Sequence, residues 1–145
     1  MTNKDARYVF IKGNLPAHDH NNELDLNTLG RALNALRDHC HANQFKWWHN
    51  EKGIKLERNK GELMMLITSE ISEAFEGERK NKNDEHLPHL KSAPVELVDA
   101  LIRIFDYAGG MGYDLLQPFV EKTQYNLTRA DHSYAERNKP NGKKF

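Results

Sequence analysis

Several features that would assign a chain to a broad class are missing from these 145 residues. The single cysteine, Cys40, excludes an internal disulfide, which fits a protein of the reducing cytoplasm. No apolar run approaches the roughly 20 residues that a helix needs to cross a bilayer. The N-terminal stretch MTNKDARYVF lacks the apolar centre of a secretory signal. The sequence therefore predicts a cytoplasmic protein without a membrane partner.

An excess of charge of one sign is also missing. Lys plus Arg and Asp plus Glu both number 21, so the formal net charge is zero. A general nucleic-acid-binding protein usually carries a basic excess or a basic stripe, and basic residues concentrate here only in the last ten positions. We therefore expect no stable nucleic-acid partner. Because we find no internal repeat and no linker, residues 1–145 are predicted to form one domain.

Hydrophobic periodicity predicts four helices, over residues 24–42, 59–80, 95–109 and 114–135. Residues 1–22 are irregular, residues 44–58 form a connector, and residues 136–145 form a basic tail that we expect to be mobile. A polar loop over 81–92 is long enough to act as a lid or specificity element. The expected fold is all-α and resembles a four-helix bundle.

Residues at the helix ends support these bounds. Asn59 followed by Glu62 resembles a capping box at the start of the second helix. Pro94 suits the first turn of the third helix. The remaining expected caps and breakers are Asp25 or Asn27 for the first helix, Gly109, Gly110 and Gly112 for the end of the third, and Asp114 for the start of the fourth.

Two carboxylate pairs with i, i+3 spacing lie in the second and third predicted helices: Glu70 with Glu73, and Glu96 with Asp99. Residues three apart project from nearly the same face of a helix. Two such helices packed side by side could therefore direct four carboxylates at one point. An all-oxygen cluster without His or Cys suits a hard divalent cation such as Mg²⁺ or Mn²⁺, usually one that also holds a phosphate.

Glu70 is the least ordinary of these residues. At about 100° per residue it falls inside the apolar arc of the second helix, with Glu73 at the edge of that arc. A glutamate that faces a core is unfavourable unless it is paired or bound to a metal. Glu96 and Asp99 instead lie on the polar arc of the third helix, where they could simply be solvated.

Residues 61–131 resemble the MazG-like all-α nucleoside triphosphate pyrophosphohydrolases, which include the dimeric dUTPase relatives. Their mark is E-x-x-E on one helix, a variable loop, and E-x-x-D on the next. This chain has SEISEAFEGERK, then PVELVDALIRIFDYAGG, then KTQYNLTRADHS, closest in appearance to the phage and bacterial MazG-like subgroup. Many members carry a further acid in E-E-x-x-E. Ser69 stands there in this chain, so that acid is absent or supplied elsewhere, for example by Glu76.

This resemblance implies Mg²⁺-dependent cleavage of a (d)NTP to (d)NMP and pyrophosphate, in nucleotide-pool control or housecleaning. By motif position Glu70, Glu73, Glu96 and Asp99 would hold Mg²⁺, which Mn²⁺ could replace. One glutamate of the first pair, Glu73 before Glu70, would also take the proton of the attacking water. The family further implies a homodimer or a homotetramer.

The resemblance extends to residues expected at the substrate. Three residues of the predicted fourth helix match the family pattern and would contact phosphate, sugar or a partner subunit: Lys122, Asn126 and Arg129. Without the resemblance these three would be an exposed amphipathic face. Tyr125 on the same helix could stack on the substrate or simply pack. Asn59 also fits the pattern. Trp47 or Trp48 could stack on a base, or both could anchor the connector to the core.

Two other interpretations were weighed against this one. A carboxylate-bridged di-iron bundle uses E-x-x-H pairs, and neither acidic pair here has His at the third place. A non-catalytic helical interaction module, or an antitoxin-like one, would leave the acids merely solvating the helices. The apolar surroundings predicted for Glu70 argue against such a module.

Overall fold

The computed structural model describes residues 26–129 and 134–141, and within them the chain is helical, without a β-strand. The predicted all-α class is confirmed. In chain order the described helices are α1 (Leu26–Asn43), α2 (Phe45–Trp48), α3 (Lys60–Lys80), α4 (Ser92–Met111), α5 (Leu116–Thr128) and α6 (Tyr134–Arg137). None of them is both long enough and apolar enough to cross a membrane.

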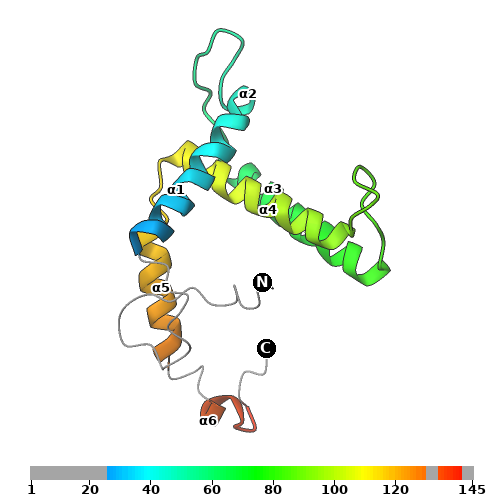
Figure 1. Ribbon diagram of the computed structural model, residues 1–145, viewed down its shortest axis with the longest axis vertical. Helices are drawn as coiled ribbons and strands as arrows, with labels where there is room; N and C mark the ends of the chain where they lie inside the picture. Colours follow the sequence, from blue (N-terminus) through cyan, green and yellow to red (C-terminus); the bar gives the residue numbers. More distant parts are fainter. Residues whose placement is uncertain (1–25, 130–133, 142–145) are drawn as a thin grey trace, which may run out of the picture. The chain divides into compact units, whose positions relative to one another are not determined.

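The chain divides into two compact units. The first unit combines Met1–Asn34 with Asp114–Phe145, and the second unit is Ala35–Tyr113. All four carboxylates of the two acidic pairs belong to the second unit. Within it, α3 and α4 lie side by side along their length and are joined at one end by the loop over residues 81–91 (Figure 1). This pair of helices carries the candidate site.

The ends of α3 are set by two asparagines. Asn59 caps the start, because its Oδ1 accepts from the backbone N–H groups of Gly61 at 2.9 Å and Glu62 at 3.3 Å. This confirms the cap predicted from the sequence. At the other end Asn81 adopts the left-handed conformation (φ 48°), and the N–H of Lys82 bonds to the carbonyl of Gly77 at 3.2 Å. The chain thereby turns back at once towards α4.

Helix α4 is longer than predicted at both ends, and the expectation that Gly109 and Gly110 end it was wrong. The helix continues to Met111, and Gly112 takes the left-handed C-cap position with φ 68°. A Cβ at Gly110 would collide with the indole ring of Trp48, and one at Gly109 would lie 2.5 Å from the Cβ of His41. These two glycines therefore allow α1 and α2 to approach α4, and they do not break the helix.

The other predicted bounds hold in part. Helix α1 fits the first prediction, but Asn27 lies inside it and is not its cap; Asp25 lies outside the described residues. Asp114 Oδ1 accepts from the N–H of Leu116 at 3.1 Å, as expected for a residue that starts α5. The predicted extension of this helix to residue 135 was wrong, since α5 ends at Thr128. Residues 1–22 and 142–145 lie outside the description.

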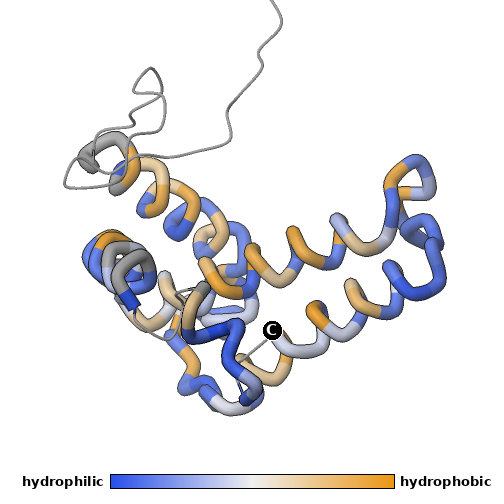
Figure 2. The backbone as a smooth tube through the Cα atoms, turned by 90° about the horizontal axis from the view of Figure 1, so that it is seen from below, coloured by the Kyte–Doolittle hydropathy of each residue, from blue (hydrophilic) through white to orange (hydrophobic). Residues whose placement is uncertain are grey.

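Each long helix of the second unit leaves an apolar stripe exposed. The stripe of α3 consists of Met64, Ile71 and Phe75, and that of α4 of Leu97, Val98, Leu101 and Ile104. Hydrophobic residues recur along both helices, whereas the loop between them is mostly hydrophilic (Figure 2). The buried positions along the two helices are mainly small, including Ala74, Gly77, Ala93 and Ala100. Close packing of the pair thus comes mainly from small residues, while the large apolar side chains of the two stripes stay exposed.

Candidate metal centre

Three carboxylates meet where α3 and α4 pack together. Glu70 comes from α3, and Glu96 and Asp99 come from successive turns of α4. One oxygen of each lies within 4.8 Å of an oxygen of the other two. The i, i+3 spacing predicted that Glu96 and Asp99 share a face, and the packing of the two helices directs that face at Glu70. Three of the four predicted ligands therefore converge.

Glu70 is buried, as its place in the apolar arc predicted, with only 6% of its surface exposed. Its partner is Arg103 of α4, whose Nε donates to Glu70 Oε1 at 2.6 Å. The Arg103 side chain remains 42% exposed, so the ion pair reaches from the interior to the surface. Arg103 follows Asp99 by four residues and Glu96 by seven, which places all three on one side of α4.

The cluster raises the pKa values of its α4 members. For Glu96 the largest cause is loss of hydration, followed by repulsion from Glu73 and Glu70. For Asp99 loss of hydration again comes first, and the charge of Glu70 adds to it, while Arg103 acts in the opposite direction. Both shifts reflect carboxylates that have lost hydration and that lie close together with too little positive charge.

Glu73 is a neighbour of this triplet but not a member of it, and its charge acts on Glu96. It is exposed and lines the same cleft, but it is not one of the three carboxylates that meet within 4.8 Å. Its position at the edge of the apolar arc of α3 accounts for this difference from Glu70, which precedes it by three residues. A carboxylate so placed can contact a molecule in the cleft without holding the same ion.

The cleft has a volume of about 530 Å³ and is completed by the loop between the helices. Loop residues along its wall are Lys82, Asp84, Glu85, His86 and Leu87. Of these the sequence indicated only His86, as a loop histidine that could contact substrate or simply be solvated. Asp84 is buried, and its Oδ1 accepts from the N–H groups of His86 at 2.9 Å and Leu87 at 2.6 Å. An acid that bonds to backbone two or three residues onward is a known turn pattern, and this signal could have marked the loop as structured.

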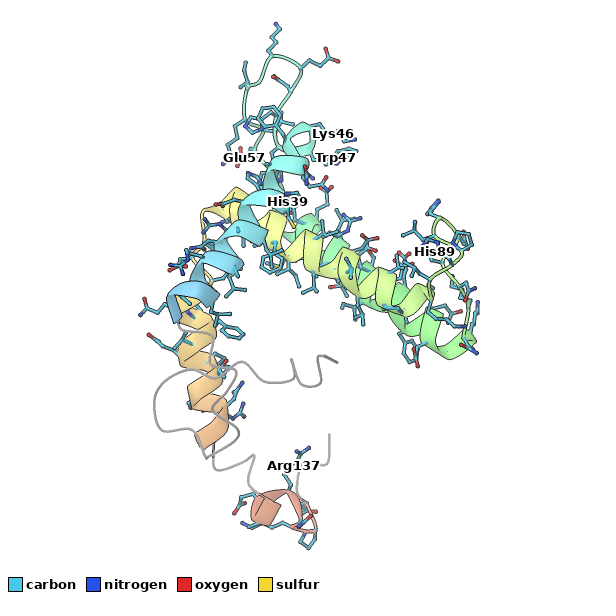
Figure 3. All side chains as sticks on the ribbon, in the orientation of Figure 1. His39, Lys46, Trp47, Glu57, His89 and Arg137 are labelled. Atoms are coloured by element: carbon cyan, nitrogen blue, oxygen red, sulfur yellow. The ribbon has the colours of Figure 1, made fainter. Side chains whose placement is uncertain are left out.

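The loop is tied to both helices rather than free. The N–H of Ser92 bonds to the carbonyl of Lys82 at 3.1 Å, and the N–H of Asp84 to the carbonyl of Leu90 at 3.0 Å. Ser92 Oγ lies 3.5 Å from Glu96 Oε1, which links the start of α4 to the carboxylate cluster. His89 projects from this loop at the end of the helix pair (Figure 3).

The donor set fits a hard divalent cation. Mg²⁺ binds oxygen at about 2.0–2.1 Å, so two ligands on opposite sides of the ion are about 4.2 Å apart. The carboxylate oxygens here span up to 4.8 Å, and a small side-chain movement would bring them into that range. His and Cys are not among the three residues of this cluster, which disfavours softer metals. Glu70, Glu96 and Asp99 could therefore hold a metal ion.

A second cleft of about 480 Å³ adjoins the first, because Asp99 and Arg103 line both. Its wall also includes Gln44, Trp47, Arg58 and Leu66. Trp47 is 57% exposed, and the Nζ of Lys46 lies 5.1 Å from its ring centroid (Figure 3). The guanidinium of Arg58 donates to the Trp47 carbonyl, which fixes the backbone of α2 against the chain that leads into α3.

Trp48 has the opposite role to its neighbour. It is only 1% exposed, and its Nε1 donates to Asp106 Oδ1 at 2.8 Å. His41 Nδ1 lies 2.8 Å from the same oxygen, and its ring meets the indole edge-on with centroids 5.2 Å apart. Burial, with the charge of Asp106, also raises the pKa of the adjacent Cys40 thiol. Of the two tryptophans considered for stacking, Trp48 is the anchor of the connector.

Ser69 and Glu76, the two positions that the resemblance left open, both form contacts within or along α3. Ser69, which stands where many family members have an acid, donates to the carbonyl of Leu66 at 2.8 Å. Glu76 forms ion pairs with Arg79 at 2.7 Å and Lys80 at 2.5 Å, which lower its pKa to about 2. Glu76 is not among the residues that line the cleft. The extra acid of the pattern is therefore not supplied by Glu76 in this arrangement.

The other residues predicted to contact substrate are not among those that line either cleft. Asn59 caps α3 and is not among the residues that line either cleft. Lys122 and Tyr125 of α5, with Arg129 at its C-cap, form a group in the first unit. Lys122 Nζ lies 4.9 Å and the Arg129 guanidinium 5.6 Å from the centroid of the Tyr125 ring. Asn126 is exposed on the same helix.

We found no family model, no curated protein and no solved structure that matches this chain.

Proposed function

We propose that the protein is a metal-dependent nucleoside triphosphate pyrophosphohydrolase of the MazG-like kind, which cleaves a (d)NTP to (d)NMP and pyrophosphate. The observation that carries the proposal is the convergence of Glu70, Glu96 and Asp99, with mutual distances within 4.8 Å, on the wall of a cleft. Such a site is large enough for a triphosphate and has the oxygen donors that Mg²⁺ or Mn²⁺ prefers.

In this proposal Glu70, Glu96 and Asp99 hold the ion, and Glu73 assists them from the rim. When bound, a divalent cation neutralises the triphosphate and lowers the pKa of the attacking water. Glu73 is suited to take the proton of that water, because it is exposed in the cleft and lies beside the ligands. The water oxygen bonds to the α-phosphorus, the bond to the bridging oxygen breaks, and pyrophosphate leaves.

The clefts offer further groups for the substrate. Lys82 and His86 on the loop are placed to donate to phosphate oxygens. The exposed ring of Trp47 in the adjoining cleft suits stacking against a base. From the family resemblance we also propose that Lys122, Asn126 and Arg129 contact the nucleotide or a partner subunit, and that Asn59 contacts the nucleotide near the start of α3. We propose the same contact for Tyr125, whose ring suits stacking.

The exposed apolar stripes of α3 and α4 support a self-associating protein, as the resemblance implies. Residues such as Phe75 and Leu101 would be covered if the helix pairs of two copies packed together into a four-helix arrangement. We propose a homodimer or homotetramer on this basis.

The deciding experiment measures release of pyrophosphate and monophosphate from each of the eight common NTPs and dNTPs in Mg²⁺, with Glu73→Gln assayed alongside. We expect release that disappears in this variant. Glu78→Gln is the matched control, because it makes the same change at an exposed position of the same helix. No release from any nucleotide, together with no Mg²⁺-dependent thermal shift, would overturn the proposal. Release that persisted in Glu73→Gln would remove only the role given to Glu73.

The second candidate function is a non-catalytic helical interaction module. The same apolar stripes favour it, since large exposed apolar side chains mark surfaces that bind other proteins. The two candidates differ in their response to metal. A ligand that binds only the folded state raises the melting temperature by mass action, whereas a protein without a metal site shows no such rise in Mg²⁺ or Mn²⁺.

A further inference from the structure

Arg103 sits between the carboxylates and the adjoining cleft. Its Nε donates to the buried Glu70 at 2.6 Å. Among the cationic residues described here, it alone lines both clefts, whereas Lys82 and His86 line only the first and Arg58 only the second. Within the described part of the chain, the positive group bonded to the carboxylate cluster therefore also lines the adjoining cleft.

Arg103 and a metal ion would compete for the carboxylate of Glu70. Without a metal, Arg103 supplies the positive charge that makes a buried carboxylate tolerable. A divalent cation held by Glu70, Glu96 and Asp99 would supply more charge at shorter range and would repel the guanidinium. Because the Arg103 side chain is 42% exposed, it can leave Glu70 without losing much packing.

We propose that Arg103 is a resident counter-ion which the metal displaces from Glu70, and that the released guanidinium then binds a phosphate oxygen of the substrate. This inference rests on the proposed function. The displacement makes nucleotide binding follow metal binding, because Arg103 becomes available to the nucleotide only after the ion is in place. Arginine suits the second task, since its planar fork of donors matches the oxygens of a phosphate group.

The opposing possibility is that Arg103 stays on Glu70 and orients it as a ligand. Outer hydrogen bonds to metal ligands usually strengthen metal binding. The two roles predict opposite signs when the arginine is replaced by an uncharged side chain of similar length. If Arg103 competes with the metal, its removal strengthens metal binding. If Arg103 orients a ligand, its removal weakens metal binding.

The first measurement is Mn²⁺ affinity, from the signal of free Mn²⁺ in electron paramagnetic resonance, for the wild type and Arg103→Met without nucleotide. We expect binding to tighten by about tenfold, in line with the loss of one hydrogen bond between charged groups. Arg79→Met is the matched control, because Arg79 donates from Nε to Glu76 at 2.7 Å on the same helix as Glu70 but outside the cleft. Weaker binding by Arg103→Met would overturn the proposal.

The second measurement observes the arginine directly. In a ¹H–¹⁵N spectrum the Nε–H signal of Arg103, assigned with Arg103→Lys, should lose its protection from exchange when Mg²⁺ is added. The Nε–H signal of Arg79 should not respond, which makes it an internal control. A non-hydrolysable triphosphate added next should restore protection at Arg103. A signal that stayed unchanged while Mn²⁺ bound in the parallel sample would overturn the inference and leave the proposed function intact.

The third measurement tests the contact with phosphate. Affinities for the non-hydrolysable triphosphate and for the matching monophosphate are compared in saturating Mg²⁺. The proposal expects Arg103→Met to lose most of the preference for the triphosphate, while Arg79→Met keeps it. If neither the wild type nor Arg103→Met bound Mn²⁺ at all, the proposed function would fail, and this inference with it.

Discussion

At the scale of single residues, Glu70 combines a structural and a chemical role. It lies in the apolar arc of α3, where a charged side chain is unfavourable, and Arg103 at 2.6 Å offsets that cost in the absence of a metal. A glutamine at this position would keep the size of the side chain and one oxygen that can accept from Arg103. It would remove the charge that a cation needs. Stability and metal binding should therefore separate at this residue.

For Glu70→Gln we expect the free energy of unfolding to change by less than about 1 kcal/mol, since Arg103 is partly exposed and can be solvated. We expect the Mg²⁺-dependent rise in melting temperature, and pyrophosphate release, to disappear. Thermal unfolding with and without Mg²⁺ measures the first two quantities. Glu78→Gln should behave as the wild type. A full Mg²⁺ shift in Glu70→Gln would show that this carboxylate is not a ligand.

The neighbouring tryptophans allow one substitution to be compared in two environments. Trp48→Ala removes a buried ring and its hydrogen bond to Asp106, and should destabilise the fold by about 3–5 kcal/mol. Trp47→Ala removes an exposed ring and should change stability by less than about 0.5 kcal/mol. Chemical denaturation measures both values.

If Trp47 stacks on the base, Trp47→Ala should raise KM for one base more than for others. An equal rise for every base would argue against stacking.

At the scale of helices, the pairing of α3 with α4 makes metal-free stability depend on pH. The pKa values of Glu96 and Asp99 are raised in the folded protein, so the unfolded chain releases these protons first. Their contribution is therefore complete below the ordinary value of 4.5 for Glu96 and is lost as pH rises through the higher folded value. Loss of hydration on burial is the larger physical cause, and repulsion from neighbouring carboxylates adds to it.

We expect Glu96→Gln to become more stable than the wild type, in the absence of metal, as pH rises from about 4.5 to 7. Urea unfolding at several pH values measures the difference between the two proteins. Saturating Mg²⁺ should reverse its sign at neutral pH, because the ion stabilises only the protein that keeps the carboxylate. A difference that did not vary with pH would show that Glu96 is not strained by its neighbours.

The sequence predicted helix ends correctly where local interactions set them, and wrongly where contacts between distant residues decide. Asn59 was identified correctly because capping is local chemistry between a side chain and the next two or three N–H groups. Gly109 and Gly110 were misread, since the same residue type serves both to end helices and to admit a close neighbour. Only the positions of His41 beside Gly109 and of Trp48 beside Gly110 decide between these uses, and both contacts join residues far apart in sequence.

The candidate site was predictable to a similar degree. Helical periodicity alone placed Glu70 in an apolar arc and set Glu96 and Asp99 on a common face, and the structure brings these three together. The pairing of Glu70 with Arg103 could not be predicted, because this contact depends on the register of α4 against α3. The sequence indicated a lid or specificity element in the loop, but not which of its residues line the cleft, for a related reason. Its residues reach the cleft through turns and backbone hydrogen bonds that have no simple period.

At the scale of the whole molecule, the exposed apolar stripes are the feature that most needs a partner. The side chains of Phe75 on α3 and Leu101 on α4 are each about half or more exposed, and they recur at helical spacing with their neighbours on the same stripe. Large contiguous apolar patches on monomers usually mark binding surfaces. A second copy of the chain is the proposed occupant, since a symmetric contact would cover the same stripe on both subunits.

Leu101→Lys places a charge in the middle of the α4 stripe and should shift the protein from dimer or tetramer to monomer. The change lies at an exposed position, so the helical far-ultraviolet signal should be retained. Sedimentation velocity over a range of protein concentrations measures the mass of the species present. Lys60→Glu, an exposed change at the first residue of α3, is the control that should leave the mass unchanged.

If Leu101→Lys kept the mass of the wild type, or the wild type were itself a monomer at every concentration, the stripe would not be a contact between copies. If the monomeric variant also lost pyrophosphate release while retaining the Mn²⁺ affinity of the wild type, the second subunit would be needed for catalysis and not for holding the ion.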